Sequence, residues 1–297
     1  MSAVPPVIVD APTTVAEVLA FHVDLDVIAV VVALLLIFHL GIRRLGPRFA
    51  PPGEPAVTRR QSLRYHAGVL ILLFVSGWPI GDIGVGSLFM AHMVEHLSLS
   101  FVIPPLLITG TPSWLLGVLL KPVMPVLRIM AKPMVALFVF NAVLAAMMMP
   151  ASVNLMLTNE PFHLASHIVL FASASLMWFP ILGSVPGLPA LAPFYRLGYL
   201  FLQSLVPTIP ATFLTLGARP LYPIYEQLPR LWGIPVYEDQ VLSGLIMKIG
   251  GGLLLWGFIT YYFFTWHAQE HDLSLRGSRD GVQGTSKEIS RKSSTRP

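Results

Sequence analysis

Seven long apolar stretches constrain the fold of this chain more than any other feature of its sequence. A membrane-spanning helix needs about 20 consecutive, mostly apolar residues. Stretches near this length lie at residues 27–42, 65–80, 87–108, 133–149, 162–182, 195–216 and 240–266. Only 11% of all residues are charged, against about 25% in a soluble domain. So few charges cannot cover a surface in water, and the sequence therefore predicts an all-α, polytopic membrane bundle of about seven transmembrane helices.

Three regions follow from these spans. Residues 1–26 carry no lysine or arginine and no short apolar core, so we expect an external N-terminal segment and not a cleaved signal peptide. Residues 27–266 form the membrane domain. Within it, 113–131 is interrupted by prolines and basic residues, which favours a segment lying on the membrane surface. Residues 267–297 are rich in serine, glycine and charge, which predicts a disordered cytoplasmic tail.

Basic residues collect in alternate connections between the predicted spans, and this distribution sets the expected orientation. The basic side has Arg43, Arg44, Arg48, Arg59, Arg60, Arg64, Lys121, Arg128, Lys132 and Arg196, and the C-terminal tail adds more. The other side has only Arg219 and Arg230. Because cytoplasmic loops are enriched in Lys and Arg, we expect the N-terminus outside and the C-terminus in the cytoplasm. The modest net charge of +4 therefore does not indicate binding to nucleic acid.

Two histidine pairs lie near the outer ends of two predicted spans. His92 and His96 share one helix face of the third span, with Glu95 beside them. His163 and His167 repeat the spacing on the fifth span. Ionisable groups in a membrane are costly and mark functional sites, and imidazole binds copper, zinc, iron and nickel. We therefore predict a metal site made by these four histidines.

The seventh span contributes further polar residues. Asp239, at its outer end, is a candidate metal ligand or a partner of an imidazole N–H, and Gln240 follows it. Lys248 lies about 12 Å into this span at 1.5 Å per residue, at a depth similar to that of Glu95. A buried Glu95–Lys248 ion pair is one hypothesis. The alternative is that Lys248 extends toward the membrane surface.

The side chains available as ligands limit which metal ion this site could bind. The chain has no cysteine, which excludes disulfides, CxxC chemistry and thiolate sites. Methionine thioethers select Cu(I), but we expect the run at 147–149 to be a packing or lipid-facing surface. A metal ion would have to be held by histidine, methionine, aspartate or glutamate.

Three segments together resemble a known family. They are HMVEHLSLSFVIPPLLITGTP at 92–112, EPFHLASHIVLFASASLMWFPILG at 160–183 and YPIYEQLPRLWGIPVYEDQVLSGLIM at 222–247. In this order they are similar to the motifs of the caa(3)-type cytochrome c oxidase assembly factor family, the CtaG proteins, over about residues 60–266. The resemblance implies seven spans and a role in maturing a copper-containing respiratory oxidase. The matching positions are His92, His96, His163, His167, Asp239 and Gln240.

The expected function combines this resemblance with the histidine pairs. It is a copper-handling assembly factor, without catalysis, that holds or delivers copper at an outer-side His/Asp site for a respiratory cytochrome c oxidase. Expected partners are oxidase subunits or an external copper chaperone, together with the lipid bilayer. The expected location is the bacterial plasma (inner) membrane. The oligomeric state stays open.

Four alternatives remain at the level of sequence. A b-type haem protein would use His96 and His167 as two axial ligands on different helices. Residues 92–96 formally match the H-x-x-E-H pattern of a metalloprotease. A retinal protein would explain Lys248, although position 244, one turn earlier, is glycine and not a carboxylate. A copper transporter would need polar groups across the whole membrane, whereas the inner halves of the histidine-bearing spans are nearly all apolar.

Overall fold

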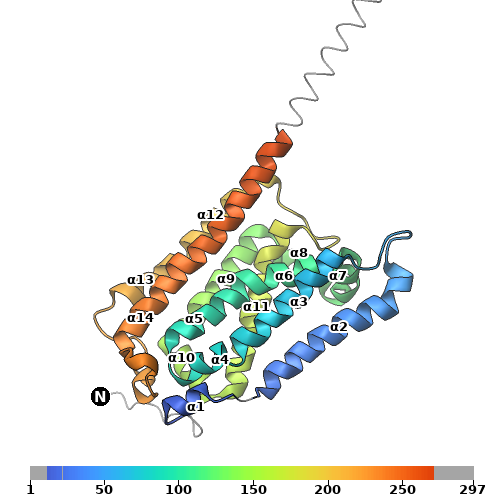
Figure 1. Cartoon of the computed structure of the whole chain (residues 1–297). Helices are drawn as coiled ribbons and strands as arrows, with labels where there is room; N and C mark the ends of the chain where they lie inside the picture. Colours follow the sequence, from blue (N-terminus) through green and yellow to red (C-terminus); the bar gives the residue numbers. More distant parts are fainter. Residues whose placement is uncertain (1–11, 22, 271–297) are drawn as a thin grey trace, which may run out of the picture.

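The computed structural model describes residues 12–21 and 23–270, and every regular element in these ranges is a helix. The helices form an elongated bundle (Figure 1). The prediction of an all-α membrane protein is confirmed. Most of the predicted tail lies outside the described residues, and the last described helix continues to Glu270.

Six helical segments within the described ranges are long and apolar enough to cross a membrane. They are Leu25–Phe49, Arg59–Gly86, Phe89–Gly110, Glu160–Leu182, Pro193–Leu216 and Val236–Glu270. Two further helix pairs pass the same test when their two helices are taken together, but each pair is bent by more than 40° between its helices. Six to eight spans agree with the predicted number of about seven.

The fourth predicted span is one of the bent pairs. Helix α9 (Pro133–Met147) turns by 69° into α10 (Pro150–Thr158). Pro150 lacks the N–H that would continue α9, so the chain changes direction there. The segment expected on the membrane surface is the other pair, in which α7 (Ser113–Leu119) turns by 59° into Lys121–Met130.

Several spans are built from consecutive short elements. The second consists of α3 (Arg59–Ser76) and α4 (Ile80–Gly86), and the third of α5 (Phe89–Leu97), the π-helical turn η1 (Ser98–Val102) and α6 (Ile103–Gly110). The sixth consists of α12 (Pro193–Leu205) and α13 (Thr208–Leu216), and the last of α14 (Val236–Leu245), a second π-helical turn η5 (Ile246–Gly250) and a continuation to Glu270.

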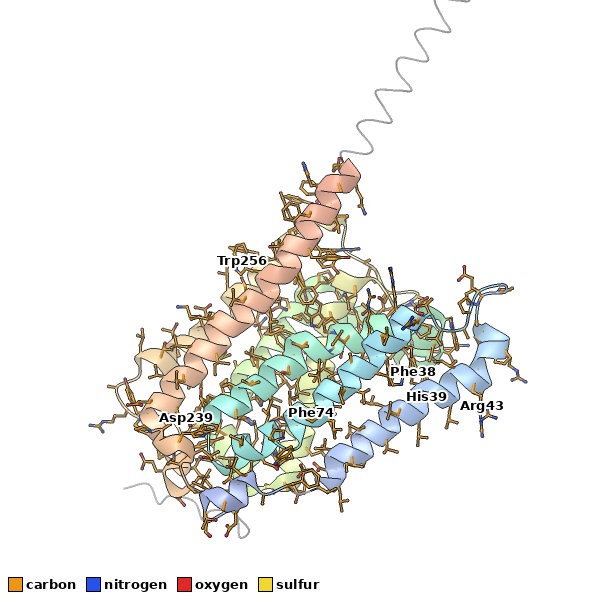
Figure 2. All side chains as sticks on the ribbon, viewed as in Figure 1. Phe38, His39, Arg43, Phe74, Asp239 and Trp256 are labelled. Carbon is orange, nitrogen blue, oxygen red and sulfur yellow. The ribbon has the colours of Figure 1, made fainter. Side chains whose placement is uncertain are left out.

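One end of the bundle gathers α1 (Val15–Leu19), α4, α10 and the beginning of α2 (Leu25–Phe49), and we call it the α1 end (Figure 1). The opposite end has α7, α8 (Met124–Met130) and the connection after α2. Arg43 lies on α2 toward this opposite end, whereas Asp239 lies at the α1 end (Figure 2). Arg43 and Arg128, which belong to two of the basic connections, therefore lie toward the end opposite Asp239.

Small residues allow the central helices to approach closely. A Cβ atom added at Gly110 of α6 would lie 2.5 Å from the backbone nitrogen of Tyr65 on α3. Gly68 on α3 faces Leu106 and Leu107 of α6 in the same way. Interfaces between membrane helices are enriched in small residues because van der Waals packing drives the association. This packing sets the position of the third span, which carries the first histidine pair.

Candidate metal centre

Three histidines and one glutamate converge inside the bundle near the α1 end. One donor atom from each of His92, Glu95, His163 and His167 lies within 4.8 Å of the other three. We call these four residues the His–Glu cluster. Donors bound to one first-row metal ion lie about 2 Å from it, so small side-chain rotations would close the cluster around a single ion.

Helix geometry explains why each element contributes two members. On α5, His92 and Glu95 are three residues apart, and on α11 (Glu160–Leu182) His163 and His167 are four apart. Both spacings place side chains on one helix face. The beginning of α11 is fixed by Asn159, whose side chain accepts a hydrogen bond from the N–H of Phe162 at 2.9 Å. The two helices therefore present two donors each to the space between them.

Glu95 connects the two helices. Its Oε1 lies 3.2 Å from His167 Nδ1, and its Oε2 lies 3.7 Å from His92 Nδ1. The carboxylate is 1% exposed, so it is held among the imidazoles and not by water. The sequence placed Glu95 beside the metal site, and the structure places it within the cluster.

The hypothesised Glu95–Lys248 ion pair is wrong. Lys248 is exposed, and the described residues contain no ion pair between the two. The two residues have similar depth in the membrane, but equal depth does not direct two side chains toward each other. The exposure of Lys248 agrees with the alternative that its side chain extends along the outside of the bundle.

His96 lies beside the His–Glu cluster without being one of its four members. Its ring centroid is 4.2 Å from that of His92 and 5.3 Å from that of His167. The structure thus brings all four predicted histidines together, with His96 at the deeper edge of the group.

Asp239 has a different partner from the one expected. Its carboxylate accepts hydrogen bonds from the backbone N–H groups of Phe89 (2.8 Å) and Met90 (2.9 Å), at the beginning of α5. It also forms an ion pair of 2.8 Å with Arg230. An acidic residue at a helix N-terminus satisfies its free N–H groups and complements its dipole. Asp239 therefore positions the helix that carries His92 and is outside the His–Glu cluster.

Gln240 is likewise engaged with the backbone. Its side-chain oxygen accepts a hydrogen bond from the N–H of Leu221, and its Nε2 donates to the carbonyl of Leu214 at 3.2 Å. It therefore fastens α14 to the end of α13.

The loop between α13 and α14 packs against the beginning of α5, where the ring of Phe89 contacts the rings of Tyr222 and Tyr225. The hydroxyl of Tyr225 donates to the carbonyl of Gly84 at 2.9 Å, and the hydroxyl of Tyr222 donates to that of Met148 at 2.7 Å. Burial raises the pKa of both tyrosines. These hydroxyls therefore remain donors to alkaline pH, well beyond the neutral range.

An acidic cavity connects the cluster with the α1 end. It has a volume of about 530 Å³, and His163 and Met156 form part of its wall. Its carboxylate-bearing lining residues are Glu17, Asp24, Asp26, Asp82 and Glu160. A hydrogen bond from the backbone N–H of Thr13 lowers the pKa of Glu17, which favours its charged form. No lysine or arginine lines this cavity among the described residues, so it attracts cations.

A second, mostly apolar cavity of about 310 Å³ reaches the cluster from the side. It lies between α2 and α11, and His163 and His167 form part of its wall. Asp26 lines this cavity as well as the acidic one. The sequence offered no signal for either cavity, because the residues that form them come from distant helices.

Comparison with known proteins identifies the family. The family model for the cytochrome c oxidase caa3 assembly factor matches residues 36–269, which is more than half of the chain. No curated protein and no solved structure matches the chain. The matched region contains the whole His–Glu cluster as well as Asp239 and Gln240. The chain belongs to the cytochrome c oxidase caa3 assembly factor family.

Proposed function

We propose that this membrane protein handles copper for the maturation of a cytochrome c oxidase, and that the His–Glu cluster holds the copper ion. The observation that carries the proposal is the convergence of four donors within 4.8 Å of one another. Family membership supplies the general role, assembly of the oxidase, and the donor set supplies the chemistry.

The hydrogen bonding of the imidazoles supports a bound cation. Among the described residues, the Nε2 atoms of His163 and His167 and the Nδ1 of His92 are buried and have no hydrogen-bond partner. A buried polar atom without a partner is unfavourable. A metal ion bound to these nitrogens removes that cost, and the Glu95 carboxylate offsets part of its charge.

Copper would reach the cluster through the acidic cavity. His163 lines that cavity and belongs to the cluster, so it is the first imidazole that an ion from the α1 end meets. In the orientation expected from the basic loops, this end faces the outside of a bacterial plasma membrane. An external copper chaperone or a copper-bearing oxidase subunit would exchange the ion there.

The proposed role is that of a chaperone and not of an enzyme. Binding and release require ligands that exchange, and histidine provides this without a closed thiolate cage. The partners are oxidase components, and the ion is the cargo that passes between them. No covalent step is needed.

The haem alternative fits the ring geometry less well. The His96 and His167 rings are in edge-to-face contact, with centroids 5.3 Å apart and an interplanar angle of 81°. Rings in direct contact leave no slot for a planar macrocycle between them. Haem ligation would require the two helices to separate.

Metal analysis with optical and EPR spectra of the purified full chain tests the proposal. The comparison uses wild type, His92→Ala, His167→Ala and the control His39→Ala. His39 lies on α2 outside the cluster, and its Nδ1 hydrogen-bonds the carbonyl of Leu35 at 2.8 Å (Figure 2).

We expect copper in wild type and in the control, and strongly reduced copper in the two cluster variants. Equal copper content in all four proteins would refute the His–Glu cluster as the site. A Soret band in wild type would establish the haem alternative.

A further inference from the structure

A small cavity lies on the deeper side of His96, and the His–Glu cluster does not use it. Its wall includes Met93, His96, Ser100 and Met247. Its volume is about 20 Å³, which is room for one water-sized occupant. It lies between α5 with its π-turn η1 and the π-turn η5 of the last span.

His96 indicates that this cavity has an occupant. The residue is 3% exposed, and neither of its ring nitrogens has a hydrogen-bond partner among the described residues. A neutral imidazole carries one N–H donor and one acceptor nitrogen. Burying both without a partner is unfavourable. Ser100 is 1% exposed, and its hydroxyl also has no hydrogen-bond partner among the residues that the structure describes.

The backbone on both sides of the cavity is unusual. The π-turn η1 begins at Ser98, two residues after His96, and the π-turn η5 contains Met247. Single π-turns inside α-helices are rare, and a large share of those that occur lie at functional sites. The two helices also approach closely, since a Cβ atom added at Gly251 would lie 3.1 Å from the Leu97 side chain.

The donor groups in the cavity wall determine which metal ion the cavity can bind. One imidazole and two thioethers form a soft set, and thioethers favour Cu(I) over the divalent metals. Met93 is 1% exposed and Met247 is 4% exposed, so both are shielded from competing ligands in water. No carboxylate lines the cavity in the part of the chain that the structure describes. Lys248 lies at its edge, and its positive charge repels a divalent ion more strongly than a monovalent one.

We propose that His96, Met93 and Met247 form a second, deeper site that binds Cu(I). The role of this site in transfer rests on the proposed copper function, because the ion would come from the His–Glu cluster. The His92 and His96 ring centroids are 4.2 Å apart, so an ion can pass between the two sites by exchange of adjacent imidazoles. The ion moves as Cu(I), and no electron transfer is required.

X-ray absorption of the purified full chain, loaded anaerobically with Cu(I), tests the second site. We compare wild type with Met93→Leu, Met247→Leu and the double variant, which are volume-conserving changes. Met148→Leu is the matched control, because Met148 is 6% exposed and does not line the cavity. Selenomethionine-labelled wild-type protein adds a readout that needs no variant.

We expect copper–sulfur scattering in wild type and in the control. The double variant should lose this scattering, and it should bind one copper ion fewer per chain. The labelled protein should show copper–selenium scattering. Copper bound in wild type through nitrogen and oxygen alone would mean that the cavity holds water only, and it would overturn this proposal. Sulfur scattering that persists in the double variant would overturn it as well.

His163→Ala and His167→Ala separate this proposal from the proposed function. If copper is bound without sulfur and these variants lose it, the His–Glu cluster stands and the second site fails. If these variants keep the full copper content of wild type and only the methionine variants lose copper, the second site stands and the His–Glu cluster fails.

Discussion

At the scale of single residues, Glu95 gives the His–Glu cluster its negative charge. It is the only carboxylate in that group of four, and it lies close to one histidine on each of two helices. A carboxylate beside metal-binding imidazoles orients the rings and raises their basicity. Under the proposed copper function, Glu95 contributes to copper affinity whether it binds the ion or only its ligands.

Glu95→Gln should lower copper affinity by about 10–100-fold, because the amide keeps the shape of the side chain and removes its charge. Competition with a copper chelator measures the change. Glu226→Gln, at an exposed position outside the cluster, is the control and should keep wild-type affinity. Unchanged affinity in Glu95→Gln would show that the cluster does not bind the ion.

Asp239 belongs to the same scale but has a structural role. Asp239→Ala should destabilise the protein by about 3–5 kcal/mol, because it leaves Arg230 and two backbone N–H groups at the beginning of α5 without their acceptor. Unfolding by denaturant in detergent measures this loss.

The folded fraction of Asp239→Ala should retain copper, since Asp239 lies outside the His–Glu cluster. Loss of copper with unchanged stability would instead make Asp239 a ligand.

At the scale of elements, the contact between α4 and α5 positions His92. A Cβ atom added at Gly84 would lie 2.9 Å from the backbone nitrogen of His92 and 3.1 Å from its Cα. Real Cβ atoms do not approach backbone atoms this closely, so only glycine permits the observed distance between the two helices.

Gly84→Ala should therefore displace α5 and cost about 1–3 kcal/mol through overpacking. Copper affinity should fall in the same variant. Gly257→Ala is the control, because nothing lies within 4 Å of an added Cβ atom at that position. Thermal unfolding and chelator competition measure both effects, and wild-type behaviour of Gly84→Ala would contradict this assignment of the contact.

The elements also show what the sequence could and could not reveal. Hydropathy located the spans because length and apolar composition alone determine membrane insertion. Helical periodicity paired the histidines for the same local reason. The partner of Asp239 and the exposure of Lys248 depend on how helices are rotated against one another. That rotation comes from tertiary packing, which one sequence does not encode locally.

The whole molecule separates charge between its ends. The connections rich in arginine are opposite the acidic cavity and the His–Glu cluster. In a membrane, this separation predicts an orientation in which the acidic cavity faces the outside.

Single-cysteine labelling measures that orientation, and the chain suits it because it contains no cysteine. Glu160→Cys lies at the α1 end and Lys132→Cys at the beginning of α9. A membrane-impermeant maleimide should label Glu160→Cys in intact cells and Lys132→Cys only after permeabilisation. The reverse pattern would place the acidic cavity in the cytoplasm.

Pulsed EPR of the Cu(II)-loaded full chain reports which atoms surround copper in the His–Glu cluster. Our proposal predicts nitrogen couplings from more than one histidine imidazole, and their reduction in His167→Ala but not in His39→Ala. Copper signals without imidazole couplings, or with couplings unchanged in His167→Ala, would contradict the assignment of the copper site to His92, Glu95, His163 and His167.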